Sequence, residues 1–463
     1  MRRFLRTYDE AIEFIFGRIN YERVAGVAYS ADDGKLERMR RLLALLDRPD
    51  ERLPAVHIAG TKGKGSTSVM AAGILSAAGY RTGLFTSPHV AAFEERMVVD
   101  GQPPTPNHIV DLANRLVGPV ERMDAGSEGG GPTYFELATA LAWLYFLDQK
   151  AEIAVLEVGL GGRLDATNIC RPIVGMITNI SRDHTNVLGS SVAQIAAEKA
   201  GIVKPGIPLI SGVASGPAGD VVEQVCRRQE SPLFRLGDEI KWRPSQNGER
   251  VSRPPSFADG HMKIDVETPW GRADDVPVSL LGSHQGANAA LAVAAARLLA
   301  TRSWTIPSRA IHDGMAAVRW PARIEVVASS PIVVVDAAHN WASTQALIDT
   351  LDDHFPGRRR ILVFAATKDK DVSGLLRLLV PRFDTVILTQ YHTNPRAVPA
   401  EELLALVQAT SLRSCHLAAD ATLAWDMARR LAAPDDLVCV TGSFFIATEI
   451  RRMLLGQQTG RQG

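Results

Sequence analysis

The part of the chain whose residue types best suit chemistry is the glycine-rich run Ala59–Thr67, Ala-Gly-Thr-Lys-Gly-Lys-Gly-Ser-Thr. A short apolar run, 55–59, leads into it, and a pattern typical of a helix, 68–78, follows it. Strand, glycine-rich turn and helix is the context in which phosphate-binding loops occur. Glycines let the backbone aim its N–H groups at an anion, and the helix N-terminus adds a favourable field. The run therefore predicts a nucleotide-binding loop.

Within this loop, Lys64 is expected to reach the outer phosphates, and the hydroxyl of Ser66 or Thr67 to turn toward Mg²⁺. Gly65 separates Lys64 from Ser66, so the run departs from the common G-x-x-x-x-G-K-[ST] pattern. Taken alone, such a run is also compatible with a surface turn.

Two further polar residues stand at the ends of apolar runs. Glu157 lies near the end of the run 153–158, before a glycine-rich turn, and Asp183-His184 follows the run 173–180. A carboxylate in a buried strand costs several kcal/mol unless it is paired or binds a metal, so Glu157 is interpreted as a Mg²⁺ ligand. Strands of open α/β sheets carry functional residues at their carboxyl ends, which favours a functional His184 over a structural one.

Other polar residues have patterns with more than one interpretation. The loop Ser87-Pro88-His89 and the cluster 93–96 after it fit either a ligand-facing or a solvated loop. Thr133 and Glu136 have the spacing of a capping box, which would explain both without any function. Lys199, near the end of a helical stretch, has the pattern of a solvated charge.

The elements that must position these residues alternate between strand and helix. A polar, proline-rich stretch, 243–260, is expected to be an exposed insertion, and the runs 262–267 and 276–281 to form strands joined by a turn at Trp270-Gly271. Beyond residue 321 the alternation predicts a second doubly wound domain. Strand-forming residues are expected over 326–335, with 332–335 at the end of that run, and over 361–365, 385–389 and 437–440. The expected helices are 343–351, 372–380, 400–408 and 421–431.

Composition limits the class of protein. A chain of 463 residues is too long for one core, and its 46% apolar and 22% charged residues are ordinary for a globular protein. The formal net charge of zero gives no electrostatic argument for nucleic acid or membrane as a partner. The 4 cysteines form no C-x-x-C pair, no secretory signal is recognised, and no apolar run is long enough to span a membrane. We therefore expect a cytoplasmic α/β protein.

The order of the motifs makes the chain resemble the folylpolyglutamate synthase and dihydrofolate synthase family, a branch of the Mur ligases. The resemblance covers nearly the whole length and also accounts for Gly65. It rests on short motifs spread along the chain: Gly60–Ser66, Thr86–His89, Phe135-Glu136, Glu157–Asn168, Asp183-His184, Glu198–Ile202, His284-Gln285 with Asn288, Arg323–Glu325 and Asp336–Asn340.

The resemblance implies a fold of two domains. A P-loop-type ATPase domain with a central, mostly parallel sheet, residues 1–321, would hold ATP. A smaller Rossmann-like α/β domain, residues 322–463, would close over it. Together they give an α/β fold class.

The resemblance also assigns roles to residues. The expected ATP contacts are Gly60, Thr61, Gly63, Lys64, Gly65, Ser66, Thr67, Asn288, Arg323 and Asp336. The expected Mg²⁺ ligands are Ser87, Glu157 and His184, and Lys199 matches a family lysine that CO₂ carbamylates to support a second metal. The expected catalytic residues are Lys64, Lys199, His184 and His339, of which His339 would orient glutamate.

The implied reaction forms an amide. ATP would phosphorylate a carboxylate of a folate or dihydropteroate, and the amine of L-glutamate would displace phosphate from the acyl phosphate. The expected partners are therefore these small molecules, with neither nucleic acid nor membrane, and a monomer is expected because family members of this size are usually monomers. The sequence leaves open whether the chain makes dihydrofolate, extends folates, or does both.

Four positions depart from the family pattern. Lys62 stands where bacterial members usually have Asn, Ala322 and Ala337 replace glycines, and Trp341 replaces a proline. The glycine losses are expected to affect turn geometry. Alternatives are a Mur-type ligase for another carboxylate acceptor, such as a peptidoglycan precursor, a nucleotide-binding protein without ligase activity, and a P-loop transport ATPase.

Overall fold

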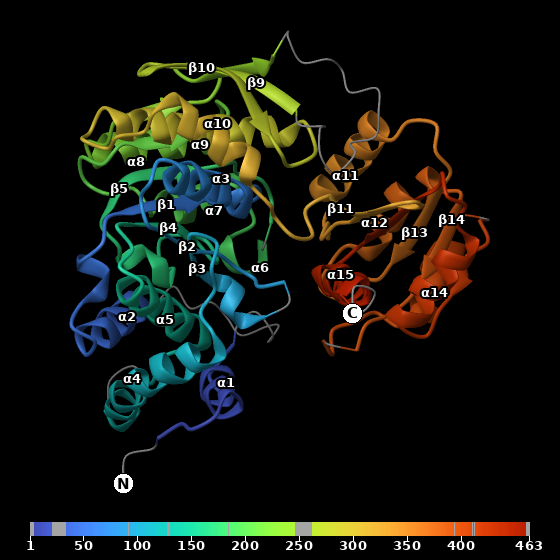
Figure 1. Cartoon of the computed structure of the whole chain (residues 1–463), viewed down its shortest axis with the longest axis horizontal. Coiled ribbons are helices and arrows are strands. Elements are labelled where there is room, and N and C mark those ends of the chain that lie inside the picture. The colour runs from blue at the N-terminus through green and yellow to red at the C-terminus, as the bar shows by residue number, and fades with distance from the viewer. Residues whose placement is uncertain are drawn as a thin grey trace. The chain divides into compact units, whose positions relative to one another are not determined.

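The computed structural model describes residues 4–20, 34–90, 92–126, 130–183, 185–245, 262–392, 394–409, 411 and 413–459. The chain divides into two compact units. The N-terminal unit contains the described residues up to Ser245 together with Lys263–Pro277 and Gly286–Val318. The C-terminal unit contains Val278–Gln285 and the chain from Arg319 onward. An α/β fold with parallel-rich sheets is confirmed in both units (Figure 1).

The main sheet of the N-terminal unit has 7 strands in the order β3-β2-β4-β1-β5-β6-β7. Only β3 runs antiparallel, to β2, so the sheet is mostly parallel as expected. The strand bounds are β1 Ala55–Ala59, β2 Thr82–Phe85, β3 Met97–Val99, β4 Ile153–Glu157, β5 Pro172–Ile177, β6 Leu209–Ser211 and β7 Leu233–Arg235. All residues of β1 and β4 are buried, which is why their sequences are nearly continuous apolar runs.

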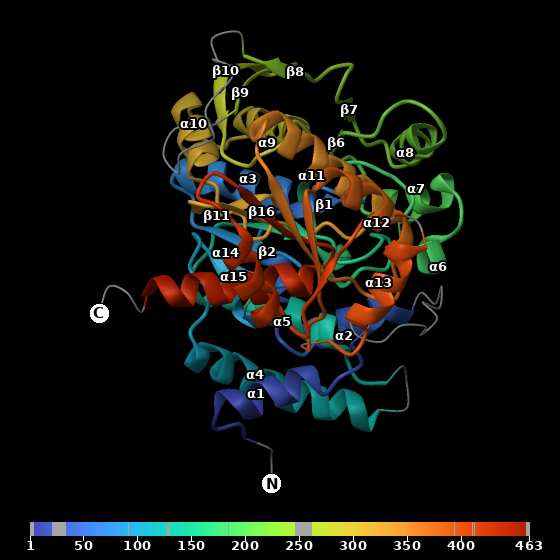
Figure 2. The ribbon, with the colours of Figure 1, turned by 90° about the vertical axis from the view of Figure 1, so that its right-hand side faces the viewer.

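Helices cover both faces of this sheet. Figures 1 and 2 show α1 (Tyr8–Phe16), α2 (Gly34–Ala44), α4 (Pro106–Ala125) and α5 (Tyr134–Asp148) on one side. On the other side lie α3 (Lys64–Ala77), α9 (His284–Ala300) and α10 (Ser308–Ala317). The helices α6 (Thr185–Leu188), α7 (Val192–Ala200) and α8 (Pro217–Arg228) complete the unit. The buried apolar residues of α1, α2, α4 and α5 form one core cluster, which fixes the first layer.

A second, 3-stranded sheet, in the order β10-β9-β8, joins Lys241–Pro244 (β8), Met262–Thr268 (β9) and Gly271–Val278 (β10). The last strand begins directly after the turn, so the predicted start at residue 276 is wrong. The expected insertion 243–260 begins inside β8, and from residue 246 it lies outside the described residues.

The C-terminal unit has a 6-stranded sheet, order β11-β12-β16-β13-β14-β15, in which only β11 is antiparallel. Its strands are β11 Glu325–Ser329, β12 Ile332–Val335, β13 Arg360–Phe364, β14 Thr385–Leu388, β15 His416–Leu417 and β16 Leu437–Thr441. Its helices are α11 Trp341–His354, α12 Val372–Leu379, α13 Ala400–Gln408, α14 Ala421–Leu431 and α15 Phe444–Thr459. The predicted β–α alternation is confirmed, while β15 and α15 were not predicted.

No helix within the described part of the chain is both long and apolar enough to cross a membrane.

Candidate active site

The glycine-rich loop links β1 to α3 with backbone angles that only glycine adopts easily. Gly60 has φ +152° and Gly63 φ +79°. Gly63 is the N-cap of α3, so the helix starts at Lys64 and the predicted start at Ser68 is wrong. A Cβ on Gly63 would overlap the side-chain amide of Asn288, on α9. The structure therefore places Asn288, a predicted nucleotide contact, directly against this loop.

The loop forms one side of a small polar recess, here called the phosphate-loop recess. It is lined by Gly60, Thr61, Lys64, Gly159, Leu160, Gly161, Asp183, Leu188 and Lys199. The glycine-rich turn after β4 and the loop after β1 thus meet here, as the carboxyl ends of neighbouring parallel strands do. Gly65, Ser66 and Thr67 are buried at the start of α3. The N–H of Thr67 donates to the carbonyl of Gly63 at 2.8 Å. The N–H groups of Lys64, Gly65 and Ser66 precede this first helical bond and have no acceptor within the helix.

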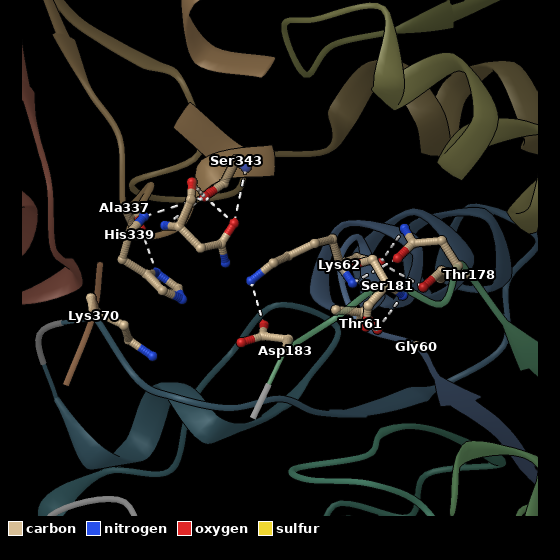
Figure 3. Close-up of polar contacts among 12 residues, drawn as sticks. Gly60, Thr61, Lys62, Thr178, Ser181, Asp183, Ala337, His339, Ser343 and Lys370 are labelled. Carbon is tan, nitrogen blue, oxygen red and sulfur yellow. Dashed lines mark hydrogen bonds and ion pairs between the residues drawn. The ribbon is translucent and has the colours of Figure 1, made fainter. Parts of the chain in front are cut away.

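Thr61 is a lining residue whose polar groups have other partners. Its N–H donates to the carbonyl of Asn179 at 2.8 Å, and its hydroxyl accepts from the N–H of Ser181 at 3.1 Å. The side chain of Lys62, at the position that departs from the family, forms an ion pair of 2.8 Å with Asp183 (Figure 3).

Lys199 is buried at the recess, with 4% of its surface exposed. Its Nζ donates to the carbonyl of Gly60 at 2.8 Å. Burial, reinforced by the charge of Lys64 and opposed by Asp183, lowers the pKa of Lys199 to about 7. A substantial fraction of the amine is therefore neutral near pH 7 and nucleophilic. The local pattern around Lys199 carried no sign of this, because the burial comes from residues distant in the chain.

The two described members of the predicted metal set are neighbours. Glu157 ends β4 with 4% exposure, and its Oε2 accepts from the N–H of Ser87 at 3.0 Å. The third member, His184, lies outside the described residues. Over the part of the chain that the structure describes, no group of 3 or more His, Cys, Asp or Glu could hold a metal by itself. A serine whose backbone N–H contacts a buried carboxylate nevertheless brings two oxygen-bearing side chains to one place, and Mg²⁺ prefers oxygen ligands.

A buried chain of hydrogen bonds holds the glycine-rich turn after β4. The N–H of Leu160 donates to Asp165 Oδ2 at 2.9 Å, and the hydroxyl of Thr167 donates to Asp165 Oδ1 at 2.6 Å. Nε2 of His57, in the middle of β1, lies 2.8 Å from the same hydroxyl. Since that hydroxyl gives its proton to Asp165, the ring donates to it. Sequence reasoning missed His57; a histidine in a fully buried strand was the available signal.

Burial raises the pKa of Asp165 and lowers that of His57 to about 3, with the charge of Lys204 adding to the latter shift. His57 is therefore neutral in the folded chain over the physiological range.

In the C-terminal unit, the carboxylate of Asp336 organises the turn that carries Arg323. Its Oδ2 accepts from the N–H of Ile324 at 2.9 Å and its Oδ1 from that of Ala338 at 2.8 Å. Burial raises the pKa of Asp336, and the charge of Arg323 opposes the shift. Ala322 has φ +54° and Ile324 φ +47°, so Arg323 is flanked by two left-handed residues. The backbone thus keeps a glycine-like conformation at Ala322.

His339 lies between β12 and α11 of the same unit. Its Nδ1 is 2.9 Å from the carbonyl of Ala337, and its N–H donates to Ser343 Oγ at 3.3 Å (Figure 3). Asn340 is the N-cap of α11, and Trp341, the first residue of that helix, is 60% exposed. The replacement of proline by Trp341 therefore leaves the helix start intact.

The predicted residues thus fall into three sets. Around the phosphate loop lie Gly60, Thr61, Gly63, Lys64, Gly65, Ser66, Thr67, Asn288 and Lys199. Ser87 and Glu157 form a hydrogen-bonded pair at the ends of β2 and β4. Arg323, Asp336 and His339 lie in the C-terminal unit.

Two family descriptions match the chain. "Mur ligase middle domain" matches residues 58–296, and "Mur ligase, glutamate ligase domain" matches residues 322–444. The chain is 33% identical over 452 residues to the dihydrofolate synthase/folylpolyglutamate synthase of Bacillus subtilis, covering 96% of this chain and 99% of that one.

Solved structures of similar proteins have the same fold as this chain. The folylpolyglutamate synthase of Mycobacterium tuberculosis complexed with ADP and AMPPCP is 34% identical, with a TM-score of 0.82 over 90% of this chain and 95% of that one. The Escherichia coli protein in complex with DHPP and ADP is 28% identical, with a TM-score of 0.81 over 98% of this chain and 99% of that one.

Proposed function

Since the chain belongs to the folylpolyglutamate synthase and dihydrofolate synthase family of Mur-type ligases, we propose that it uses ATP to join L-glutamate to a carboxylate of a folate or of dihydropteroate. The observation that best supports this is that Lys64 and Lys199 line one recess with two glycine-rich turns. A protein that only binds a nucleotide needs phosphate contacts, but not a second, buried amine beside them. The complex of the Mycobacterium tuberculosis relative with ADP and AMPPCP supports ATP as the nucleotide.

The chemistry begins with a poor electrophile. A carboxylate has no good leaving group, so transfer of the terminal phosphoryl of ATP to its oxygen makes an acyl phosphate and releases ADP. The amine of L-glutamate then attacks the acyl carbon, phosphate leaves with the C–O bond, and the amine loses a proton as the amide forms. Catalysis is mainly positioning and charge neutralisation.

In the N-terminal unit, the backbone from Gly63 to Thr67 binds the phosphates and Lys64 offsets the charge of the transferring group. Thr61 and Gly60 shape the recess, and Asn288 contacts the nucleotide from α9. The predicted roles of these residues stay proposals.

Ser87, Glu157 and His184 would hold Mg²⁺, which supplies positive charge to the phosphate oxygens when bound. The neutral fraction of Lys199 would attack CO₂, forming an N–C bond and losing a proton to give a carbamate. That carboxylate would support a second metal.

We propose an ATP-binding domain 1–321 and a C-terminal domain 322–463, in which Arg323 and Asp336 would contact the nucleotide. His339 would orient glutamate. We further propose that the protein acts as a cytoplasmic monomer on these small molecules alone, with light scattering and cell fractionation as tests.

The deciding experiment measures ADP release with Mg²⁺, ATP and L-glutamate, supplying either 7,8-dihydropteroate or tetrahydrofolate, with products weighed by mass spectrometry. Addition of glutamate to both acceptors establishes a bifunctional enzyme, which we propose, and addition to one establishes which activity it has. If neither acceptor stimulates ADP release, the folate proposal is wrong, and another Mur-type acceptor or a non-catalytic nucleotide-binding role remains.

Lys204 provides a control for Lys199. Both amines are largely buried and donate to a carbonyl at 2.8 Å, but Lys204 contacts Asn168 and does not line the recess. Lys199→Met should abolish glutamate transfer while Lys204→Met retains it. Equal activity of the Lys199 variant and the wild type would remove Lys199 from the mechanism. Intact-mass measurement under CO₂ tests the carbamate.

A further inference from the structure

A side chain from the segment that follows the neighbouring strand β5 holds the phosphate loop by the backbone N–H and carbonyl of Lys62. Asn179 follows β5, and its Oδ1 accepts from the N–H of Lys62 at 3.0 Å while its Nδ2 donates to the carbonyl of Lys62 at 3.0 Å. An N–H can only donate and a carbonyl can only accept, so the two bonds require a carboxamide in one orientation. Neither an aspartate nor an aliphatic residue could make both.

Other contacts reinforce this clamp. Thr178 Oγ1 donates to the same carbonyl of Lys62 at 2.6 Å. In the reverse direction, the hydroxyl of Thr61 binds the backbone of Ser181, accepting from its N–H and donating to its carbonyl at 3.3 Å. Figure 3 shows Thr61, Lys62, Thr178 and Ser181 gathered in this way. Side chains of Thr178 and Asn179 thus bond to the backbone of the phosphate loop, and the side chain of Thr61 in that loop bonds to the backbone of Ser181.

The clamp matters because the loop cannot satisfy these groups itself. Lys62 precedes Gly63, the N-cap of α3, so its N–H and carbonyl lie outside the helical hydrogen-bond pattern. The loop also holds Gly60 and Gly63 at positive φ, a conformation that an unconstrained glycine exchanges freely with others. With Lys62 turned toward Asn179, the unpaired N–H groups of the first turn of α3 are left for an anion.

We propose that Asn179 is a positioning residue that holds the phosphate loop in its nucleotide-binding conformation before the nucleotide arrives. It acts through the Lys62 peptide groups and touches neither substrate nor metal. The inference rests on the proposed function only in taking the anion to be the phosphates of ATP. Pre-organisation of this kind increases affinity by reducing the ordering cost of binding.

Asn114 provides a matched control. Its Oδ1 accepts from the N–H of Leu5 at 2.8 Å and its Nδ2 donates to the carbonyl of Leu5 at 2.8 Å. It is half-buried like Asn179 and belongs to the same unit, but it joins α4 to the N-terminal segment and has no part in the recess.

The experiment compares Asn179→Ala, Asn114→Ala and the wild-type chain. Three quantities are measured: the dissociation constant for AMPPCP, the exchange rate of amide hydrogens over residues 59–66 without nucleotide, and KM values for ATP and L-glutamate. Loss of two hydrogen bonds that organise the loop should weaken AMPPCP binding about tenfold and speed exchange in Asn179→Ala. The AMPPCP affinity and the exchange rate should be unchanged in Asn114→Ala. KM for L-glutamate should be unchanged in the two variants.

Unchanged nucleotide affinity in a folded Asn179→Ala variant overturns the proposal, as does weaker affinity with unchanged exchange, which would indicate direct contact with the nucleotide. If the alanine variant does not fold, Asn179→Ser, whose single hydroxyl cannot bond both the N–H and the carbonyl of Lys62 as the carboxamide does, is judged by the same criteria. Nucleotide binding without glutamate transfer by the wild-type chain would defeat the proposed function and leave this inference intact. Failure of the wild-type chain to bind AMPPCP would overturn both.

Discussion

Two turns in this chain place a proposed nucleotide contact beside left-handed backbone, and they do so by different means. The phosphate loop removes the Cβ atoms, with Gly60 and Gly63 at positive φ. The turn around Arg323 keeps side chains at Ala322 and Ile324 and holds their N–H groups with carboxylates. Glu325 accepts from Ala322 at 2.8 Å and Asp336 from Ile324 at 2.9 Å.

The difference follows from what surrounds each turn. At Gly63 there is no room for a Cβ beside Asn288. A substituted residue there would therefore have both the backbone strain of a positive φ and a steric overlap with Asn288. At Ala322 the buried methyl group has space, and Glu325 is itself anchored by Arg451 through bonds of 2.7 and 2.9 Å. A left-handed L-residue costs about 1–2 kcal/mol, which two fixed carboxylates can offset. Glycine is thus required where space is absent, and is replaceable where the backbone is held.

The largest effect is expected for Gly63→Ala. The added methyl group would overlap Asn288, and alanine would also be strained at this positive φ. The value of kcat/KM for ATP should therefore fall about a hundredfold, or ~3 kcal/mol. Steady-state kinetics measure it. Gly79 has φ +94° with open space around its missing Cβ, so Gly79→Ala should leave kcat/KM unchanged. Equal losses in both variants would mean that backbone strain alone, and not the contact with Asn288, distinguishes the phosphate loop.

The strands that precede the two turns' anchoring residues also differ: β1 leads into the phosphate loop, and β12 leads into Asp336, which holds the turn around Arg323. β1 contains the buried His57, while β12 is entirely aliphatic. The pKa of His57 is about 3 in the folded chain against an ordinary value of 6.5, so between these values the unfolded chain binds a proton that the folded chain does not. The free energy of unfolding should therefore fall as the pH drops below 6.5, by about 2 kcal/mol at pH 5.

His57→Gln, which keeps an N–H for Thr167, should remove this acid sensitivity, whereas replacing the exposed His108 by Gln should leave it. Denaturant unfolding at pH 7 and pH 5 measures the difference. Identical pH dependence of wild type and His57→Gln would show that His57 is not the group responsible.

Asp336→Asn tests the carboxylate that holds the turn around Arg323. One of its two oxygen acceptors becomes an NH₂ group facing a backbone N–H, so the free energy of unfolding of the C-terminal unit should fall by about 2 kcal/mol. Denaturant unfolding checks this. Asp353→Asn, on the exposed face of α11, should change it little. A neutral result at Asp336 would remove the carboxylate from the explanation of the left-handed turn.

The smallest effect is expected for Ala322→Gly. Relief of the positive φ should outweigh the extra entropy of the unfolded chain and raise the free energy of unfolding by about 0.5 kcal/mol. Ala337→Gly, at the other lost glycine, should instead lower it, because Ala337 is buried without a positive φ. Thermal unfolding should thus shift in opposite directions for the two variants. Shifts in the same direction would contradict the strain assigned to Ala322.

Local patterns predicted the parts of this molecule that depend on near neighbours. The apolar runs of β1 and β4, the glycine-rich loop and the capping box of Thr133 and Glu136 were all recognisable from sequence, and the capping box is present. The pattern could not show that Glu136 also pairs with Arg38 of α2, through contacts of 2.8 to 3.1 Å.

The secondary-structure predictions that were wrong or missing concern elements that depend on their surroundings more than on their own sequence. α3 was predicted to begin at Ser68, but Gly63 caps the helix and Lys64 starts it, although glycine and serine are poor helix formers. The short edge strand β15 carries little pattern of its own and depends on the sheet it joins.

The sequence by itself determined which groups are available: a loop that can turn its amides inward, lysines, and a carboxylate at the end of a strand. Only the tertiary structure decided what those groups became. Lys199 has a pKa of about 7 because a neighbouring strand's loop and Lys64 surround it, and Lys62 keeps its peptide turned away from the recess because Asn179 lies beside it. Charge and hydrogen-bonding capacity belong to a residue, whereas desolvation and geometry come from residues more than a hundred positions away.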